Sequence, residues 1–596
     1  MSHSAGFWPS ALLPENVVAQ GVSFADPDIK NGRCYWVEKR PPLGKGLIVS
    51  YGPEGYTEET STDVFHVGTN AHGYGGGSFT ASETKLYFFD NKSSSLVEKN
   101  LITGEFRFLT PPDPQTCYGD FYTQNGFLYA LRTTKKQPFE ECTLVKVTLS
   151  SSKIEVLQHG ADFYANPRPS PCGRYLAWLQ WDMPHMPWDE CTLWVQKEGG
   201  SPLRLTPPLA SAFQPTWQGE KLVFASDEYN GYWNLFQWEK QEIKPYLPLQ
   251  EHEIGRPLWV LGCNTFGFLG KDKLLYAFCQ QGQWKTGYAQ GTVSNTVETD
   301  WPQIAALATE GNQALLIAGS ATESWCILKC HTDNIEKPEV LRKSSSAHLL
   351  PQLSTPQFLD LGACHVIYYP PCGPYVLQTP PPLILKVHGG PTAQADTVLQ
   401  MKVQYYTSRG FAYAEVNYRG SSGYGRAYRD ALKGKWGIAD VEDCIESAKA
   451  LVAQGLGDAQ HLFIIGNSAG GLTALNALIQ FPGFFCGAVC HYAVSNLTSL
   501  GENIHKFEAH YEKNLLGSEG YLRSPHLRAH EIKTPLLLTH GQKDKVVPCS
   551  QSEQLARQMP HARLVSYPEE GHGYSPQTAV HVLEQELAFF QRLLKS

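Results

Sequence analysis

A serine between glycines stands at the junction of an expected strand and an expected helix. Residues 461–465 are mostly apolar and typical of a buried strand, GNSAGG follows at 466–471, and the residues after it predict a helix. Gly-x-Ser-x-Gly in this context is typical of a nucleophile elbow, a sharp turn that exposes the serine hydroxyl above a sheet. We therefore expect Ser468 to attack a carbonyl carbon. The alternative is a plain glycine-rich turn.

A serine hydroxyl is a weak nucleophile near neutral pH and needs a base that is itself held in place. Asp544 is the only aspartate after Ser468, and it lies in the loop after a strand expected at 535–539. His572 comes later, between two glycines, after a strand expected at 562–567. In α/β-hydrolases, loops after strands supply the acid and then the histidine. We predict that His572 accepts the serine proton and that Asp544 fixes the histidine tautomer; later glutamates are weaker candidates for the acid.

The attacked carbonyl becomes an oxyanion, which needs hydrogen-bond donors already in place. The first expected donor is the backbone N–H of Ala469, the residue after the nucleophile. The second is the N–H of Gly390 in the sequence HGGP at 388–391, which follows a strand expected at 383–387. Glycines let the backbone approach a substrate closely. The alternative for this loop is an ordinary tight turn.

Strands and helices alternate around these residues in the second half of the chain. Strands are expected at 383–388 and 411–418, and 441–454 has the pattern of an amphipathic helix. This alternation predicts a doubly wound, mostly parallel sheet with helices on both faces. We predict an α/β-hydrolase domain over 346–596, of which 346–360 is a linker.

The first half of the chain carries a repeat of short apolar runs, each entered from a turn. Their starts are separated by 52, 41, 48, 47, 52 and 40 residues, close to the length of one four-stranded blade of a β-propeller. Seven runs predict an all-β, seven-bladed propeller over 26–345, and a β-sandwich pair is the alternative. Residues 1–25 are expected to form an N-terminal extension that packs on the hydrolase. The runs begin at Cys34, Leu86, Phe127, Tyr175, Leu222, Leu274 and Ala314.

The composition excludes several classes of protein. The chain has 596 residues, too many for one small binding module, with 42% apolar residues and a net charge of −8. We find no run of lysine and arginine and no apolar stretch near the length of about 18 residues that a membrane span needs, so neither a nucleic-acid nor a membrane partner is expected. The 15 cysteines lack metal-ligand spacing, which indicates reduced thiols in a cytoplasmic protein. The expected chemistry needs no metal or organic cofactor, and a homo-oligomer stays open.

Five motifs follow one another behind the expected propeller: HGGP, NYRGSSGYG (417–425), GNSAGG, HGQKDKVVP (540–548) and GHGY (571–574). In this order they resemble the prolyl oligopeptidase family of serine peptidases, in particular its acylaminoacyl-peptidase and dipeptidyl-peptidase-like branch. The resemblance implies a serine peptidase whose active site lies in a cavity between hydrolase and propeller. Only short or unfolded peptides would then reach the serine.

Two positions depart from the pattern of the family. His388 stands where some branches carry a tyrosine whose hydroxyl serves the oxyanion hole, which favours a hole made of two backbone amides. Ala469 stands where many members have tyrosine, which removes a ring from the floor of the site. Pocket geometry borrowed from the family is therefore in doubt.

Three candidates for substrate contact lie in loops that follow strands. His388 is the first, in the HGGP loop. Arg419 and Tyr424 follow the strand at 411–418, on the side where such sheets bind ligands. Arg419 could contact a substrate backbone or carboxylate, and a structural bond to neighbouring loops is an equal alternative.

Three further candidates lie in the segment 491–511, which is expected to line an apolar pocket for the residue on the acyl side. Tyr492 and Phe507 would contribute aromatic walls. The resemblance adds Glu508, or the acidic pair at 227–228, as a carboxylate that could hold a free substrate amine. A structural ion pair for Glu508 and a solvated turn for the pair are the alternatives.

The expected function is hydrolysis of short peptides through an acyl-enzyme on Ser468, by an acylaminoacyl- or dipeptidyl-type exopeptidase or an oligopeptidase. An esterase or a specialised amidase acting on a small natural product is one alternative, since the same triad serves esters. A propeller interaction scaffold with an inert hydrolase domain is another. The sequence leaves open which residue precedes the cut and whether the N-terminus of the substrate is free or acylated.

Overall fold

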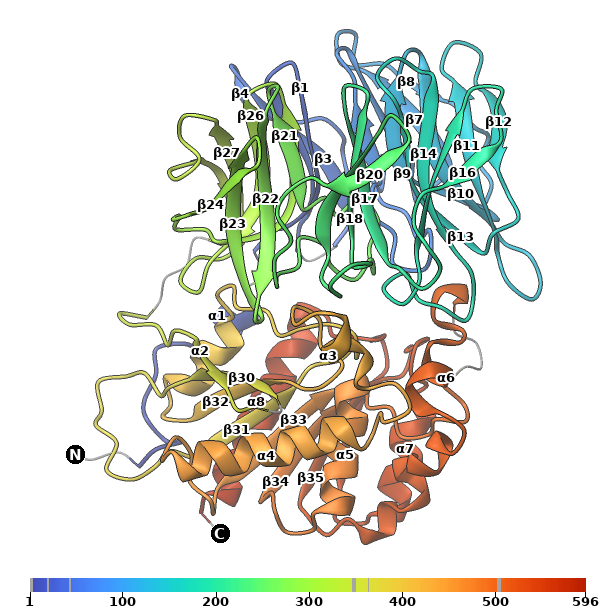
Figure 1. The fold of residues 1–596 in the computed structure, drawn as a ribbon. Coiled ribbons are helices and arrows are strands. Elements are labelled where there is room, and N and C mark those ends of the chain that lie inside the picture. The colour runs from blue at the N-terminus through green and yellow to red at the C-terminus, as the bar shows by residue number, and fades with distance from the viewer. Residues whose placement is uncertain are drawn as a thin grey trace.

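The protein consists of a β-propeller stacked on an α/β unit (Figure 1). The structure, a computed structural model, describes residues 4–18, 21–41, 44–345, 350–362, 364–500 and 505–595. The propeller contains seven four-stranded sheets, and one eight-stranded sheet forms the centre of the α/β unit. The predicted fold class, a seven-bladed propeller followed by an α/β-hydrolase domain with a mostly parallel sheet, is confirmed.

Each blade is an antiparallel sheet of four consecutive strands. In chain order the blades are β1 (Ser23–Lys30), β2 (Arg33–Lys39), β3 (Gly46–Gly52), β4 (Gly55–Glu58); β5 (Phe79–Ala81), β6 (Lys85–Asp90), β7 (Ser95–Asn100), β8 (Phe106–Phe108); β9 (Thr116–Gln124), β10 (Phe127–Thr134), β11 (Glu141–Thr148), β12 (Lys153–Gln158); β13 (Phe163–Pro169), β14 (Tyr175–Trp181), β15 (Thr192–Lys197), β16 (Pro202–Arg204); β17 (Ala212–Gln218), β18 (Lys221–Ser226), β19 (Asn234–Glu239), β20 (Glu242–Pro245); β21 (Phe266–Leu269), β22 (Lys273–Gln280), β23 (Gln283–Gln290), β24 (Val293–Val297); and β25 (Gln303–Glu310), β26 (Gln313–Gly319), β27 (Cys326–His331), β28 (Glu339–Lys343).

The apolar runs of the first half form the second strand of every blade. That strand is paired on both sides within its sheet, and its side chains are buried on both faces, as in β18 and β26. A strand buried on both faces appears in the sequence as a continuous run of apolar residues. The outermost strands, such as β8 and β16, are fully exposed and carry no comparable signal.

Polar side chains of innermost strands clamp neighbouring blades together. Asp26 in β1 accepts a hydrogen bond from the backbone N–H of Gly77 in the next blade at 2.9 Å. Asp120 in β9 accepts a hydrogen bond from the backbone N–H of Asn166 in the next blade at 2.5 Å. Gln214 in β17 likewise accepts one from a backbone N–H at the start of the blade that follows its own. The three acceptors have positive φ values of 50°, 52° and 48°, each at a register shift that turns the side chain out of its own sheet.

The sheet of the α/β unit has the order β29-β30-β32-β31-β33-β34-β35-β36. The pairs β29–β30 and β30–β32 are antiparallel and the others are parallel. The strands are β29 (Gln357–Asp360), β30 (His365–Tyr369), β31 (Leu383–Val387), β32 (Ala412–Asn417), β33 (Leu462–Asn467), β34 (Gly487–His491), β35 (Leu536–Gly541) and β36 (Arg563–Tyr567).

Helices cover both faces of this sheet. The α-helices are α1 (Pro14–Val18), α2 (Met401–Thr407), α3 (Arg426–Asp430), α4 (Ala439–Ala453), α5 (Ala469–Gln480), α6 (Tyr511–Leu516), α7 (Ser550–Gln558) and α8 (Pro576–Leu593), and the 3-10 helices are η1 (Lys506–Glu508), η2 (Gly520–Arg523), η3 (Pro525–Leu527) and η4 (Ala529–Glu531). Alternate residues of β31 point to opposite faces, so Leu385 packs with α4 and α5, and Ile384 packs with α2 and α8.

The N-terminal segment packs on the α/β unit. The backbone N–H of Trp8 donates to the carbonyl of Arg409 at 3.2 Å, and Leu12 is buried in the core shared by α2 and α8. The first propeller strand begins at Ser23, three residues before the predicted start at 26. β28 ends at residue 343 and β29 begins at 357, so the last four residues of the predicted linker at 346–360 form the first strand of the α/β sheet, and we propose that the linker is the stretch before that strand. Residues 346–349 lie outside the described residues.

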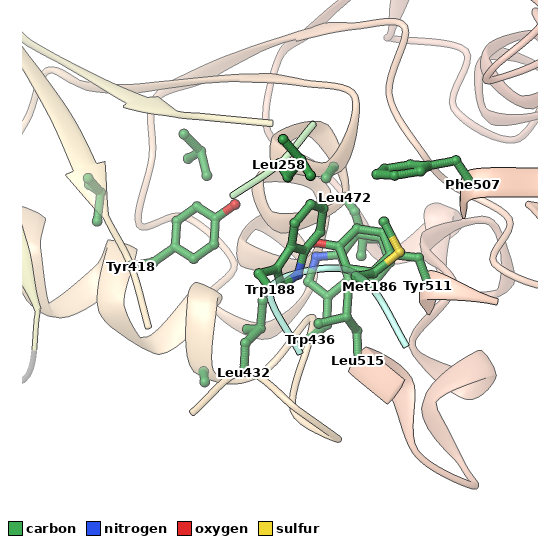
Figure 2. Packing of buried hydrophobic residues seen from close by; sticks show 14 of the residues in the cluster. Met186, Trp188, Leu258, Tyr418, Leu432, Trp436, Leu472, Phe507, Tyr511 and Leu515 are labelled. Carbon is green, nitrogen blue, oxygen red and sulfur yellow. The ribbon is translucent and has the colours of Figure 1, made fainter. Parts of the chain in front are cut away.

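Ion pairs and aromatic rings join the propeller to the α/β unit. The guanidinium of Arg429, on α3, is buried and lies 2.7 Å from Asp227 and 3.3 Å from Glu253 of the propeller. Trp188 of the propeller also packs against Tyr511 of the α/β unit, with ring centroids 5.6 Å apart (Figure 2). The two units therefore share one apolar core. Within the described ranges, no helix combines the length and the apolarity that a membrane crossing requires.

Candidate active site

The predicted elbow is a strained turn between β33 and α5. β33 ends at Asn467, α5 begins at Ala469, and Ser468 between them has a φ of +52°. Residues other than glycine rarely adopt this backbone conformation because it is strained, and strained residues of this kind are characteristic of functional sites. A Cβ on Gly466 would collide with the carbonyl oxygen of Gly470, so glycine at 466 is required for the backbone to turn this tightly. A Cβ on Gly470 would collide with the carbonyl oxygen of Val387, so glycine at 470 lets the turn pack closely on β31.

The structure brings Ser468, His572 and Asp544 together in one hydrogen-bonded series. Nε2 of His572 lies 3.1 Å from Oγ of Ser468, and Nδ1 of the same ring lies 2.7 Å from Oδ2 of Asp544. Because an ionised carboxylate only accepts hydrogen bonds, Nδ1 carries the ring proton and donates it to Asp544. Nε2 is then the acceptor that faces the serine hydroxyl.

Asp544 is held by donors on both of its oxygens. Oδ1 accepts hydrogen bonds from the backbone N–H groups of Val546 and Val547 at 2.8 and 2.9 Å, and Oδ2 lies 3.3 Å from Nε2 of His540. Burial acts to raise the pKa of the Asp544 carboxyl, but the hydrogen bonds from His540 and His572 outweigh it and hold this pKa well below its ordinary value. The carboxylate is therefore ionised near neutral pH and can stabilise a positively charged imidazole ring.

Tyr492 lies against the imidazole of His572. The two ring centroids are 4.6 Å apart, and the backbone N–H of Tyr492 donates to the carbonyl of Thr539 at 2.8 Å. A φ of +36° turns the chain sharply here, directly after β34. We expected this ring in the substrate pocket, but it packs on His572 because the turn directs it toward the histidine loop.

Two backbone N–H groups beside Ser468 are free to bind an oxyanion. The residues concerned are the predicted ones, Gly390 and Ala469, and both line the cavity that contains the serine. Neither N–H donates to any other residue in the described part of the chain. The N–H of Ala469 also belongs to the first turn of α5, where the helix dipole favours negative charge.

His388 supports the loop of Gly390 and does not line the cavity. Its Nε2 lies 2.8 Å from Oγ of Ser421 and its Nδ1 lies 2.8 Å from the carbonyl oxygen of Gly389. The ring stacks on Tyr418, with centroids 4.4 Å apart. Burial lowers the pKa of His388 to about 4, so the ring is neutral near pH 7. Both ring nitrogens already have partners, so the structure supports a role in holding the loop, and the contact with substrate stays a prediction.

The cavity at Ser468 is small, apolar on most sides and acidic on one. Its volume is about 40 Å³. Aromatic and aliphatic groups form most of the wall, and two carboxylates are added by η1 and α6. The lining residues are Gly390, Pro391, Trp436, Ser468, Ala469, Val494, Leu500, Glu508, Tyr511, Glu512, Val546 and Val547.

Glu508 lies in the cavity wall as expected, but its carboxylate is also held from the propeller. The hydroxyl of Tyr74 donates to Oε2 of Glu508 at 2.8 Å, and Nε2 of His505 lies 3.0 Å from the same oxygen. Phe507 does not line the cavity. Its ring is buried against propeller aromatics that include Trp259, because the chain turns through η1 and directs neighbouring side chains to different sides.

The structure does not bring Arg419 or Tyr424 to the cavity. The guanidinium of Arg419 lies 2.8 Å from Asp443 and 2.9 Å from Glu442, both on α4. The hydroxyl of Tyr424 accepts a hydrogen bond from the side chain of Asn417 at 2.9 Å, and its ring stacks on a histidine of β30. Both groups already bind partners within the α/β unit or pack against it, which for Arg419 is the structural alternative stated above. Their contact with substrate stays a prediction.

Several residues of the site were not predicted from the sequence. Trp436 lies in the loop between α3 and α4, and Tyr74 comes from the propeller; neither belongs to a motif that would have marked it. Glu512 had a weak signal, since it follows Glu508 by four residues just beyond the segment expected to line the pocket.

Comparison with known proteins places the C-terminal part in a peptidase family. The profile described as prolyl oligopeptidase family matches residues 397–596. Dipeptidyl aminopeptidase BIII from Pseudoxanthomonas mexicana is 33% identical over 213 residues, which are 33% of this chain and 31% of that protein. An acylamino-acid-releasing enzyme from Arabidopsis thaliana is 30% identical over 217 residues, which are 33% and 28% of the two chains. The chain thus spans about a third of the curated relatives it matches.

Solved structures extend the similarity over the whole chain. A puromycin-hydrolyzing peptidase of Mycobacterium tuberculosis is 30% identical and superposes with a TM-score of 0.93, covering 99% of this chain and 97% of that one. A puromycin hydrolase is 26% identical with a TM-score of 0.91, covering 100% and 98%. Taken with the profile and the geometry of the elbow, these matches show that the chain belongs to the prolyl oligopeptidase family.

Proposed function

We propose that the chain is a serine peptidase that hydrolyses short peptides through an acyl-enzyme on Ser468. His572 would be the general base and Asp544 the third member of the catalytic triad. The observation that carries this proposal is the hydrogen-bonded series from Ser468 to Asp544 at a cavity that also exposes two free backbone N–H groups. The same constellation performs acyl transfer on unrelated folds.

The acylation step follows from this geometry. Nε2 of His572 takes the proton of Ser468 while Oγ bonds to the carbonyl carbon of the substrate. The carbonyl oxygen becomes an oxyanion and accepts hydrogen bonds from the N–H groups of Gly390 and Ala469. The imidazolium, stabilised by Asp544, then gives its proton to the leaving amine, the C–N bond breaks, and the acyl group stays on the serine.

Deacylation repeats these steps with water in place of the amine. His572 removes a proton from the water, whose oxygen bonds to the acyl carbon and forms a second oxyanion at the same two N–H groups. The ester bond to Ser468 then breaks and the serine oxygen recovers the proton from Nε2. These steps need no metal or organic cofactor.

The propeller restricts the substrate to short chains in this proposal. The cavity is small, and the segment that forms one wall is packed against propeller aromatics. Two relatives are named dipeptidyl aminopeptidase and acylamino-acid-releasing enzyme, which supports an exopeptidase of one of these types over an esterase or an inert scaffold. We also propose a cytoplasmic location and keep a homo-oligomer as a prediction.

Replacement of the nucleophile tests the proposal. We expect Ser468→Ala to abolish hydrolysis of peptide anilides and labelling by a fluorophosphonate, because both require the serine oxygen. Ser518→Ala, at an exposed serine of the α/β unit, is the matched control and should retain both. Labelling or hydrolysis that survives Ser468→Ala would refute the assignment.

Puromycin is a second substrate for the same assay. Two structural neighbours that match over the full length are named for its hydrolysis, and the bond cleaved would be an amide, as in a peptide. Release of the aminonucleoside by the wild type and not by Ser468→Ala is the expected result.

A further inference from the structure

The loop that carries His572 receives little support from its own backbone. It runs from Gly571 to Tyr574, between β36 and α8. Within the described part of the chain, none of its backbone groups takes part in a backbone–backbone hydrogen bond. A Cβ on Gly573 would meet no other atom within 4 Å, so packing does not confine the loop at that position. The place of His572 is therefore fixed by contacts of side chains.

Tyr574 anchors this loop to β35. Its hydroxyl lies 2.6 Å from Oγ1 of Thr539, and its ring packs on that of Tyr492 with centroids 5.6 Å apart. Tyr492 in turn packs on the imidazole of His572, and its backbone N–H donates to the carbonyl of Thr539 at 2.8 Å. Thr539 thus holds a residue of the histidine loop with its hydroxyl, and the ring that covers the imidazole with its carbonyl.

The hydroxyl of Thr539 is itself held from the neighbouring strand. Its Oγ1 lies 2.6 Å from Nδ1 of His491, which is its register partner on β34. Nε2 of the same ring lies 3.1 Å from Oε1 of Glu586 on α8, and this buried carboxylate lies 2.9 Å from Nζ of Lys402. We call Tyr574, Thr539, His491 and Glu586 the anchor series.

The charge of Glu586 sets the direction of the hydrogen bonds in the anchor series. Burial acts to raise the pKa of Glu586, but Lys402 and His491 outweigh it and hold this pKa well below its ordinary value. The carboxylate is therefore ionised and only accepts. Burial lowers the pKa of His491, so its neutral ring carries one proton, on the Nε2 that faces Glu586. Nδ1 then accepts from Thr539, and the oxygen of Thr539 accepts from Tyr574.

We propose that Thr539 and Tyr574 are positioning residues for His572. Their hydrogen bond fixes the end of the histidine loop, and the ring of Tyr492 then holds the imidazole with Nε2 at 3.1 Å from Oγ of Ser468. This inference rests on the proposed function, because it takes His572 as the general base. No member of the anchor series lines the cavity at Ser468. The series therefore acts on the geometry of the base, to which the rate of proton transfer is sensitive, and does not contact the substrate.

The closing experiment measures kcat and KM for a peptide anilide on the wild type, Thr539→Val and Tyr574→Phe. Each substitution removes one hydroxyl with little change of shape. Titration with a fluorophosphonate to its end point counts the active sites, so that kcat is expressed per active site and a loss of folded protein does not lower it. We expect each variant to lower kcat about 3- to 10-fold, the range of one hydrogen bond. KM should stay within about 2-fold of the wild type, because no binding contact is removed.

Two controls separate the hydroxyls from general damage to the loop. Thr539→Ser keeps the hydroxyl and should retain kcat within about 2-fold of the wild type. Tyr567→Phe removes a hydroxyl that lies 3.0 Å from Nδ1 of His581, on a ring that also packs against Tyr574 with centroids 5.5 Å apart, and it should leave kcat unchanged. Because the two hydroxyls of the anchor series act through one hydrogen bond, the loss in the double variant Thr539→Val/Tyr574→Phe should be smaller than the product of the single losses.

The outcomes separate this inference from the proposed function. A wild-type kcat in Thr539→Val and Tyr574→Phe would overturn it, and so would an effect confined to KM or an equal loss in Thr539→Ser. Single losses that multiply in the double variant would show that the two hydroxyls do not act together. If Thr539→Val does not fold, the comparison of Tyr574→Phe with Tyr567→Phe decides alone. A wild type that the fluorophosphonate does not label would instead contradict the proposed function.

Discussion

One oxygen of Asp544 decides which nitrogen of His572 carries the ring proton. Oδ2 lies 2.7 Å from Nδ1 of His572, and Oδ1 accepts hydrogen bonds from two backbone N–H groups at 2.8 and 2.9 Å. Every group around the carboxylate is therefore a donor. The side chain fits this place only if both of its oxygens are acceptors, which makes Asp544→Asn an informative substitution.

The asparagine must place its NH2 group against one of these donors. If the NH2 faces His572, Nδ1 becomes an acceptor, the ring proton moves to Nε2, and the ring no longer accepts the proton of Ser468. If the NH2 faces the loop, it opposes two backbone N–H groups and leaves them unsatisfied. The first orientation is the one that the hydrogen bonds to Oδ1 favour. In a serine protease the same change lowers kcat by about 10⁴-fold, so we expect a rise of about 5 kcal/mol in the barrier here.

The assay is kcat for a peptide anilide at pH 7.5, with folding checked by circular dichroism. Asp458→Asn is the matched control, because Nδ1 of His461 lies 2.7 Å from Oδ2 of Asp458 in the same kind of pair, at the surface of the α/β unit. We expect the control to change kcat by less than about 2-fold. A loss of less than 10-fold in Asp544→Asn would refute the tautomer argument.

Three further predictions follow from contacts outside the triad. Tyr74→Phe removes the hydroxyl that the propeller donates to Glu508; the carboxylate is then no longer held in one position, so kcat/KM for a peptide anilide should fall about 3- to 10-fold, and an unchanged value would contradict a role of this contact in shaping the cavity wall. Arg429→Met leaves the buried carboxylate of Glu253 without its ion-pair partner and leaves Asp227 paired with Arg426 alone, and it should lower the free energy of unfolding, measured in urea, by about 3–5 kcal/mol. The ring nitrogens of His72 have no hydrogen-bond partner among the described residues, and burial lowers its pKa to about 3, so below its ordinary pKa of 6.5 only the unfolded chain takes up the proton. The free energy of unfolding therefore decreases as the pH is lowered, and His72 contributes about 2 kcal/mol of this loss at pH 5. His72→Asn should make the loss between pH 7.5 and 5 smaller by about this amount, and an unchanged loss would refute the assignment.

The elbow was predictable because its causes are local. The turn from β33 into α5 needs glycine at 466, because a Cβ there would collide with the carbonyl oxygen of Gly470 four residues later. Such a requirement can be recognised from residues that are neighbours in the sequence. The acid and the histidine were predictable for a different reason, since the order of strands fixes which loops meet at the edge of the sheet.

The number of blades could be predicted from the sequence, but the hydrogen bonds that join neighbouring blades could not. The second strands are buried on both faces, so they must be apolar along their whole length. The clamps between blades follow no pattern of residue type, because Asp26, Asp120 and Gln214 perform the same task with different side chains. Their positive φ values, which the task requires, leave no consistent trace in the sequence.

Arg419 lies away from the cavity for a physical reason. Arg419 follows the carboxyl end of a parallel strand, where ligands bind in such sheets, but the same edge is also where loops bind one another. The ion pair of Arg419 with Asp443 joins its loop to α4. Whether an arginine at this edge faces substrate or helix depends on a partner distant in the sequence, and single-chain patterns do not contain that information.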